Sequence, residues 1–342
     1  MPTQKKPRFS GRRVVIVLLL ALLICTLLTS CFTDGNGETT NIFIVILVKP
    51  FAYILRWIYG WCNSFGWSLI LFTLLTRLVL LPLNIKSKKG MAEMQALQPK
   101  MKELEKKYQN DKQKYQEEVS KLYKKEGVSP MGGCLPTLIT LPIMFALYWP
   151  ISQPLKYLMN LSSAQIDAVR DQLVLIGAQV NGVLVSATSS EMTLVQAIHD
   201  NIAAVSSISE NIIPMNLMFL GMNLGAVPSF TTFNILFILP ILSAGTSFLL
   251  SKLTTWLQER STGVKSTQQN GMMMWMMPLI SIWVGFTLPA GLTVYWIAGN
   301  VFGVLQEFFI TYYLQRKKEK APLKEADSSN DKNSRSNRKN NR

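Results

Sequence analysis

The chain has 342 residues, 49% of them hydrophobic, with a mean hydropathy of +0.21 and a formal net charge of +15. This combination is typical of a polytopic membrane protein with basic loops rather than of a soluble domain. One histidine, His199, and cysteines without a CxxC pair argue against metal and redox chemistry, so no cofactor is expected.

The amino terminus has the pattern of a bacterial signal peptide, with basic residues before an apolar run over residues 14–28. Leu28-Thr29-Ser30-Cys31 resembles a lipobox, so we expect cleavage of residues 1–30 and lipidation of Cys31. An uncleaved signal anchor that ends in an incidental cysteine is the alternative. Residues 31–60 would then lie outside the cell, with an amphipathic stretch in the membrane interface.

Further along the chain, apolar stretches recur that are long enough, or nearly so, to cross a bilayer as helices. A span needs about 20 predominantly apolar residues. The predicted spans cover residues 61–85, 131–151, 233–253, 272–288 and 290–314. The sequence therefore predicts an all-α polytopic membrane protein.

Lysine and arginine placement gives the orientation of these spans. Residues 86–130 are rich in lysine and are predicted to be cytoplasmic, whereas residues 152–232 hold only Lys156 and Arg170 and are predicted to lie outside. The loop 254–271 returns to the cytoplasm. The chain is thus expected to end inside the cell.

The cytoplasmic segment 86–130 has its own helical pattern. Apolar residues recur every three or four positions from Met91 to Tyr108 and again from Tyr115 to Leu122, which predicts two helices packed as a charged hairpin. The basic tail, residues 315–342, is expected to be disordered. It is interpreted either as a topology determinant or as an electrostatic arm for ribosomal RNA.

Arg77 is the one full charge in the middle of an otherwise apolar stretch. In a continuous helix it would lie about 18 Å from Phe65 and about 13 Å from Lys86. A mid-bilayer arginine costs about 2.5–3.5 kcal/mol unless it faces water or a partner. No carboxylate lies centrally in any predicted span, and the nearest candidate is Glu307. Arg77 therefore indicates a water-filled cavity; an arginine paired with a carboxylate inside the bundle is the alternative.

Hydroxyl and amide side chains in the spans are candidates to line this cavity with weak, exchangeable hydrogen bonds. They are Thr73, Thr76, Thr140, Ser243, Thr246, Ser247 and Asn300. The alternative for each is an ordinary hydrogen bond between helices.

Several sequence motifs occur in the order found in one known family. They lie at residues 66–83 (GWSLILFTLLTRLVLLPL), 121–136 (KLYKKEGVSPMGGCLP), 141–143 (LPI), 238–242 (ILPIL) and 289–296 (PAGLTVYW). Over about residues 50–315, the chain resembles the YidC/Oxa1/Alb3 membrane protein insertases. With its lipobox, it resembles the Gram-positive form of YidC.

The resemblance implies a five-helix core around a hydrophilic groove that is open to the cytoplasm and to lipid, with the groove arginine of the family at Arg77. It also implies a role for two further positions. Ser251 stands where the family often has a glutamine, and Trp296 stands where it has an aromatic residue near the groove. Ordinary packing between helices is the alternative for Trp296.

The expected function is the insertion and folding of membrane proteins in the bacterial plasma membrane, without nucleotide. Expected partners are nascent membrane proteins, the Sec translocon, membrane lipids and, through the hairpin and tail, the ribosome. A transporter or channel is the main alternative, but no inverted repeat or carboxylate relay is present. A membrane enzyme is disfavoured because no catalytic or nucleotide-binding pattern occurs. An assembly chaperone without insertion activity stays open.

Overall fold

The computed structural model describes residues 31–33, 39–41, 43–128, 135–228, 234–264 and 268–340. The chain divides into two compact units, the first formed by residues 1–68 and 142–219 and the second by residues 69–141 and 220–342. The boundaries fall within α3 (Phe65–Val79) and α7 (Leu135–Ser152), so both helices contribute to both units. The predicted signal peptide, residues 1–30, lies outside the described residues.

The first unit combines one long helical stretch with several short elements. They are β1 (Cys31–Thr33), β2 (Thr39–Asn41), η1 (Ile44–Val48), α2 (Lys49–Cys62), α8 (Pro154–Tyr157), α9 (Ser163–Leu175), β3 (Gln179–Val180), β4 (Val183–Leu184), α10 (Glu191–Asp200), α11 (Ile202–Val205) and β5 (Met218–Phe219). Strands β1 and β2 form an antiparallel pair, as do β3 and β4. The predicted loop 152–232 thus contains short helices and hairpins.

Helix α2 has two unlike faces, as its amphipathic sequence predicts. On one face Arg56 Nη1 donates to the Leu158 carbonyl (3.0 Å), and the Tyr59 hydroxyl donates to the Pro214 carbonyl (3.2 Å), which ties α2 to the rest of the first unit. On the other face, Trp57 and Trp61 are 53% and 75% exposed. Exposed tryptophans are typical of a helix at a membrane interface.

A half-buried carboxylate joins α8 and α10 in the same unit. Glu191 Oε2 accepts hydrogen bonds from the backbone N–H groups of Leu155 (2.9 Å) and Lys156 (3.2 Å). Burial raises the pKa of Glu191 above its ordinary value, and the two N–H donors only partly oppose this shift because they favour the charged form. The carboxylate therefore fixes the start of α8.

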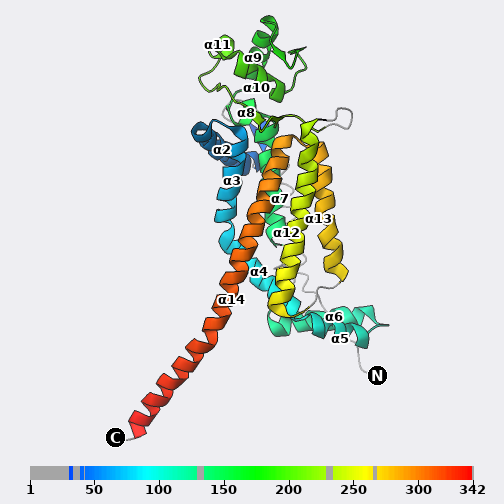
Figure 1. Cartoon of the computed structure of the whole chain (residues 1–342), viewed down its shortest axis with the longest axis vertical. Helices are drawn as coiled ribbons and strands as arrows, with labels where there is room; N and C mark the ends of the chain where they lie inside the picture. Colours follow the sequence, from blue (N-terminus) through cyan, green and yellow to red (C-terminus); the bar gives the residue numbers. More distant parts are fainter. Residues whose placement is uncertain are drawn as a thin grey trace. The chain divides into compact units, whose positions relative to one another are not determined.

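The second unit is built mainly from long helices. Its elements are α4 (Leu81–Ala96), α5 (Gln98–Lys107), α6 (Lys112–Glu126), β6 (Met222–Asn223), η3 (Ile235–Phe237), α12 (Ile238–Thr262), α13 (Gln268–Thr287) and α14 (Ala290–Asn340). Helix α12 packs against both α13 and α14, and α4 contacts α12 and α14 (Figure 1). A Cβ atom at Gly285 would lie 2.9 Å from the Cα of Pro240, so α13 approaches α12 closely at a residue without a side chain.

The first predicted span is broken. Helices α3 and α4 meet at an angle of 58°, where the sequence predicted one continuous helix over residues 61–85. Pro82 lies in the first turn of α4 and has no N–H to donate to the carbonyl four residues earlier. Arg77 consequently lies in the last turn of α3 rather than in mid-helix.

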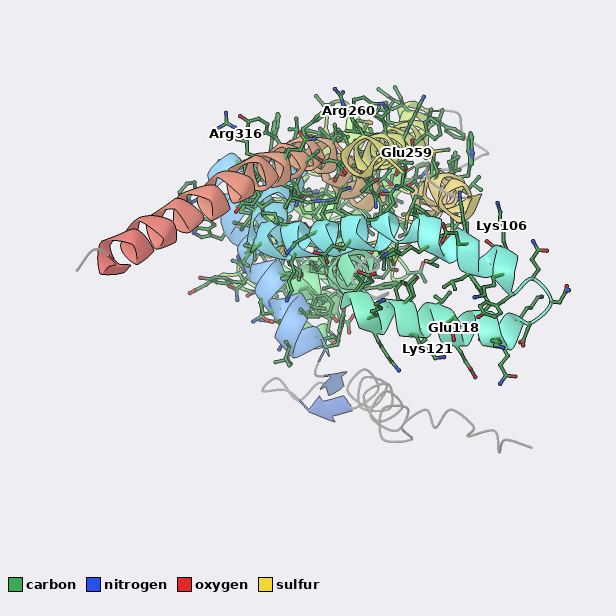
Figure 2. The ribbon with its side chains drawn as sticks, turned by 90° about the horizontal axis from the view of Figure 1, so that it is seen from below. Lys106, Glu118, Lys121, Glu259, Arg260 and Arg316 are labelled. Atoms are coloured by element: carbon green, nitrogen blue, oxygen red, sulfur yellow. The ribbon has the colours of Figure 1, made fainter. Side chains whose placement is uncertain are left out.

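The predicted charged hairpin is present as α5 and α6. The Tyr123 hydroxyl reaches the Met101 sulfur (3.3 Å) and Lys100 pairs with Glu126 (2.7 Å), which joins the two arms. Charged side chains, including Lys106 on α5 and Lys121 on α6, cover its outside (Figure 2). The tail differs from the expectation of disorder, because α14 continues to Asn340. Residues with high helix propensity, such as lysine, glutamate and alanine, are frequent where α14 passes residue 315.

Among the described residues, two helical stretches are long and apolar enough to cross a membrane, Ile44–Cys62 and Ile235–Thr262. The bent pair of α3 and α4 makes a third if it counts as one span. Ile44–Cys62 was expected to be interfacial, and its length and composition also suit a span. The second stretch covers the predicted span 233–253. The chain therefore has membrane-spanning helices, and the five-span arrangement stays a prediction.

Candidate functional site

Arg77 reaches from α3 toward α14. Within the described ranges, its side chain makes no hydrogen bond or ion pair, and the neighbouring group with which it interacts electrostatically is the phenol of Tyr295. Two glycines of α14 lie against it. A Cβ atom built at Gly299 would stand 3.4 Å from Arg77 Nη2, and one at Gly303 would stand 3.6 Å from Nη1. The guanidinium thus lies beside bare α14 backbone.

The carboxylate that the sequence offered as a partner for Arg77 is engaged elsewhere. Glu307 of α14 forms an ion pair and a hydrogen bond with Lys88 of α4, and both side chains are only 11% exposed. Tyr295, Gly299, Gly303 and Glu307 recur every four residues and so share one face of α14. The paired-arginine alternative, with Glu307 as the partner, is therefore not what the structure contains.

A hydrogen-bonded polar network joins α12, α13 and α14. Asn300 Nδ2 donates to Ser247 Oγ (2.8 Å) and to Thr246 Oγ1 (3.1 Å), and Trp296 Nε1 donates to Ser247 Oγ (3.2 Å). Ser247 Oγ lies 2.6 Å from Ser281 Oγ, which donates in turn to the Met277 carbonyl (2.9 Å). Four residues predicted from the sequence, Thr246, Ser247, Trp296 and Asn300, are brought together here.

The direction of each hydrogen bond in this network follows from the capacity of a hydroxyl group. A serine hydroxyl donates one hydrogen bond and accepts two. Ser247 already accepts from Trp296 and Asn300, and Ser281 already donates to the Met277 carbonyl, so Ser247 must donate to Ser281. The Ser247 oxygen is then saturated. The network accordingly holds three helices together, the role that had been weighed against cavity lining.

The remaining predicted residues have more local roles. Thr73 donates to the Leu69 carbonyl (2.6 Å) and Thr76 to the Thr73 carbonyl (2.8 Å), both on α3, which leaves the Thr73 methyl carbon facing Gly299. The Ser251 carbonyl accepts a hydrogen bond from Thr255 (3.0 Å), and its own side chain is half-buried.

Two predicted residues fall where the structure describes little. Thr140 lies in α7 with its side chain outside the described part of the structure. Cys31 begins β1, again without a described side chain. Lining of a cavity by Thr140 and lipidation of Cys31 therefore stay predictions.

Several residues of this region were not singled out from the sequence. They are Ser281, Lys88, Gly299 and Gly303. Ser281 is fully buried and completes the polar network, but a serine in an apolar stretch has no pattern that separates it from a packing residue. The two glycines do carry a signal, because their four-residue spacing places both on one face of a helix.

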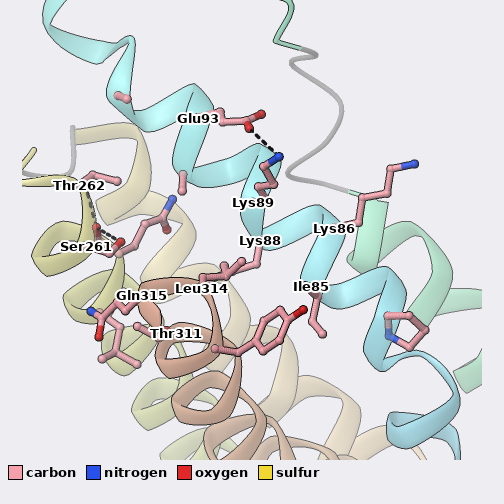
Figure 3. A pocket seen from close by; sticks show the side chains of 16 residues that line it. Ile85, Lys86, Lys88, Lys89, Glu93, Ser261, Thr262, Thr311, Leu314 and Gln315 are labelled. Carbon is pink, nitrogen blue, oxygen red and sulfur yellow. Dashed lines mark hydrogen bonds and ion pairs between the residues drawn. The ribbon is translucent and has the colours of Figure 1, made fainter. Parts of the chain in front are cut away.

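The second unit also contains a cavity of about 700 Å³ between α4, α12 and α14 (Figure 3). Apolar Ile85 and Leu314 and polar Gln258 and Thr311 line it. Lys89 at its edge pairs with Glu93 (3.6 Å). Arg77 is not among the residues that line this cavity.

A family model and the named relatives of this chain point to the same protein family. Residues 57–318 match the family model described as 60Kd inner membrane protein. A "Membrane protein insertase YidC" from Wolinella succinogenes is 31% identical over 87% of this chain, which covers 43% of that protein's length. A "Membrane protein insertase YidC" from Alkalihalophilus pseudofirmus is 30% identical over 86% of this chain, which covers 93% of that protein's length. A "Membrane protein insertase YidC 1" from Listeria monocytogenes is 30% identical over 96% of this chain, which again covers 93% of that protein's length.

Among solved structures, an "Active YidC insertase crystal structure with the first transmembrane domain resolved" is similar with a TM-score of 0.45 and 20% identity, over 85% of this chain and 49% of that chain. The family model spans most of this sequence, including α3, α12, α13 and the first part of α14. The chain therefore belongs to the 60Kd inner membrane protein family, with relatives named membrane protein insertase YidC.

Proposed function

We propose that this protein inserts membrane proteins into the bacterial plasma membrane and assists their folding, with Arg77 as the residue that attracts the hydrophilic part of the substrate. One observation carries the proposal: the guanidinium of Arg77 has no ion-pair partner within the described residues, while Glu307 is paired with Lys88. A permanent positive charge without a partner favours carboxylates supplied by another molecule.

The physical problem for an insertase is the hydrocarbon core, which is about 30 Å thick. A hydrophilic segment must cross it before the neighbouring apolar segment can settle as a helix. Water near Arg77 would shorten the dry path, and the charge would attract acidic residues of the segment. Transfer of the apolar segment into lipid then drives the step without nucleotide.

The hydroxyl groups of Thr73 and Thr76 are proposed to lie along the path of the hydrophilic segment, beside Arg77. Thr140 and Ser251 are proposed for the same path. Trp296, with Thr246, Ser247 and Asn300, is proposed to support its wall, since these four are tied to one another across α12 and α14. The path itself is proposed to open to the cytoplasm.

The partners follow from charge and topology. The lysine-rich hairpin and the basic end of α14 are proposed to face the cytoplasm and to contact the ribosome, because basic segments bind phosphate backbones without sequence readout. The lipidated Cys31 is proposed to anchor the outer amino terminus. Insertion is proposed to take place alone or beside the Sec translocon.

The test uses the purified full-length protein in liposomes of bacterial lipids. A single-span substrate with two acidic residues in its translocated segment is added, and insertion is measured by protease protection. We expect protection several-fold above that of empty liposomes. A companion assay follows the release of a small trapped dye and potassium efflux. Release of dye or potassium without protease protection of the substrate would contradict the insertase proposal and favour the channel alternative.

A further inference from the structure

We infer that Gly299 and Gly303 are positioning residues for Arg77, which hold a space on α14 into which its guanidinium fits. The inference rests on the proposed function, because it concerns the residue that attracts the substrate. It concerns α14 residues that make no contact with the substrate themselves. Their role is to set where the charge can lie.

Gly299 supplies the first half of the argument. A Cβ atom there would stand 3.4 Å from Arg77 Nη2, which is the lower limit of ordinary contact, and 3.8 Å from Thr73 Cγ2. Alanine would therefore just fit. Valine would add two methyl carbons, each about 1.5 Å beyond Cβ, because a β-branched residue fills two of the three positions around Cβ. Valine at position 299 would therefore displace the guanidinium.

Gly303, one turn further along α14, limits the other edge of the guanidinium. A Cβ atom there would stand 3.6 Å from Arg77 Nη1, and 3.0 Å and 3.3 Å from the two terminal carbons of Leu250 on α12. Alanine at 303 would push the Leu250 side chain aside and would come into ordinary contact with the guanidinium. The two glycines thus bracket both terminal nitrogens of Arg77 from the same face of α14.

Glycine is less favourable than alanine in a helix interior. Gly299 and Gly303 are buried, and close approach of helix backbones is the usual reason for such glycines in membranes. Here what approaches Gly299 is a charged side chain and the methyl carbon of Thr73. Gly245 on α12 is a useful contrast, because a Cβ atom there would meet nothing within 4 Å.

The experiment compares Gly299→Ala, Gly299→Val and the matched control Gly245→Val in the liposome assay. Two substrates are used that differ only in two acidic residues or two glutamines in the translocated segment. We expect Gly299→Val to lower insertion of the acidic substrate about fivefold or more and that of the neutral substrate less than twofold. Gly299→Ala and Gly245→Val should stay within twofold of the parent for both substrates.

A combined variant separates positioning from a structural role. In an Arg77→Ala background, Gly299→Val should cause no further loss, because the group that it displaces is gone. An additional loss there, or an equal loss for both substrates, would show that Gly299 serves only helix packing and would overturn the inference. If Arg77→Ala itself lowers neither substrate, the proposed role of Arg77 fails instead. Melting temperatures in detergent check that each variant is folded.

Discussion

Two adjacent faces of α14, offset by about 60° around the helix axis, treat buried polar groups in opposite ways. The face with Trp296 and Asn300 joins α12 in a network in which Ser247 and Ser281 use their hydrogen bonds among themselves and the backbone. The face with Gly299 and Gly303 meets Arg77, which has no hydrogen-bond partner in the part of the chain that the structure describes.

The contrast shows what each face can do. The Ser247 oxygen is saturated and has no hydrogen bond to offer a passing polypeptide, so its contribution is to fix the helices. A cation beside bare backbone keeps its charge available. Among the described residues, Ser247 thus joins helices, whereas Arg77 makes no hydrogen bond or ion pair, and the proposed difference in role can be tested.

The largest effect on stability is expected at Lys88 of α4, which pairs with Glu307 on the same face of α14 as Gly299 and Gly303. Lys88→Gln leaves the Glu307 carboxylate buried without its cation, and loss of one partner of a buried pair costs about 3 kcal/mol. Thermal unfolding in detergent should show a clear fall in melting temperature. Lys89→Gln, at an exposed pair, should change stability by less than about 0.5 kcal/mol. Adding Glu307→Gln to Lys88→Gln should recover much of the loss; no recovery would count against the pair.

Arg77 is expected to show the next largest effect, and in insertion rather than stability. Arg77→Ala should lower insertion of the acidic substrate about tenfold, the loss expected for one charge-assisted hydrogen bond. Arg77→Lys should keep much of the activity, since it keeps the charge. Protease protection of matched acidic and neutral substrates gives the measurement. Equal insertion of the acidic substrate by Arg77→Ala and the parent would remove the charge from the mechanism.

Variants of the face with Trp296 and Asn300 should change stability rather than substrate preference. Asn300→Leu removes the donor to Ser247 and Thr246, and hydrogen bonds between membrane helices contribute about 1 kcal/mol. We expect a lower melting temperature with an unchanged ratio of acidic to neutral substrate. Thr255→Val is the control, because its hydroxyl donates to the Ser251 carbonyl of its own helix and bonds to no other helix among the described residues. A changed substrate ratio in Asn300→Leu would place this face in the binding path.

Glu191 in α10 allows a partly buried polar group to be compared with an exposed one. Its expected effect, on the pH dependence of stability, is the smallest of the four. Its raised pKa means that the folded chain binds the proton more tightly than the unfolded chain. Its contribution to stability is therefore present below the ordinary value of 4.5 and is lost as pH rises through the folded pKa. Glu191→Gln should flatten this dependence, by less than about 1 kcal/mol, in melting curves between pH 4 and 7. Glu210→Gln is the exposed control, and an unchanged profile in Glu191→Gln would contradict the assignment.

Much of the helical architecture was predictable because apolar runs and charge placement have strong signals. The paired arms α5 and α6 follow from the spacing of apolar residues from Met91 to Tyr108 and from Tyr115 to Leu122, and α12 follows from a long apolar run. The break at Pro82 was visible in the sequence but was read as part of one span. A proline at that position is compatible with a kinked helix as well as with a new one, so the sequence alone did not decide the depth of Arg77.

The sequence offers the residue types of the candidate site but not their pairing. Arg77 stands out because its charge is isolated in the sequence, and Glu307 was the candidate partner because other predicted spans lack a central carboxylate. That Lys88 holds Glu307, and that Ser247 bonds to Ser281 of another helix, depends on which helix faces meet. Those contacts come from packing between segments far apart in sequence, which a single sequence does not encode in a readable pattern.

The break between α3 and α4 has an electrostatic consequence. Peptide dipoles add along a helix, so its carboxyl end carries about half a unit of negative charge, felt mainly within the last turn. Arg77 lies in the last turn of α3, three residues before the bend. An unbroken helix would carry that negative end away toward residue 96. By ending at Val79, α3 brings its own macrodipole to the guanidinium, a diffuse counter-charge that eases the burial of a cation without neutralising it.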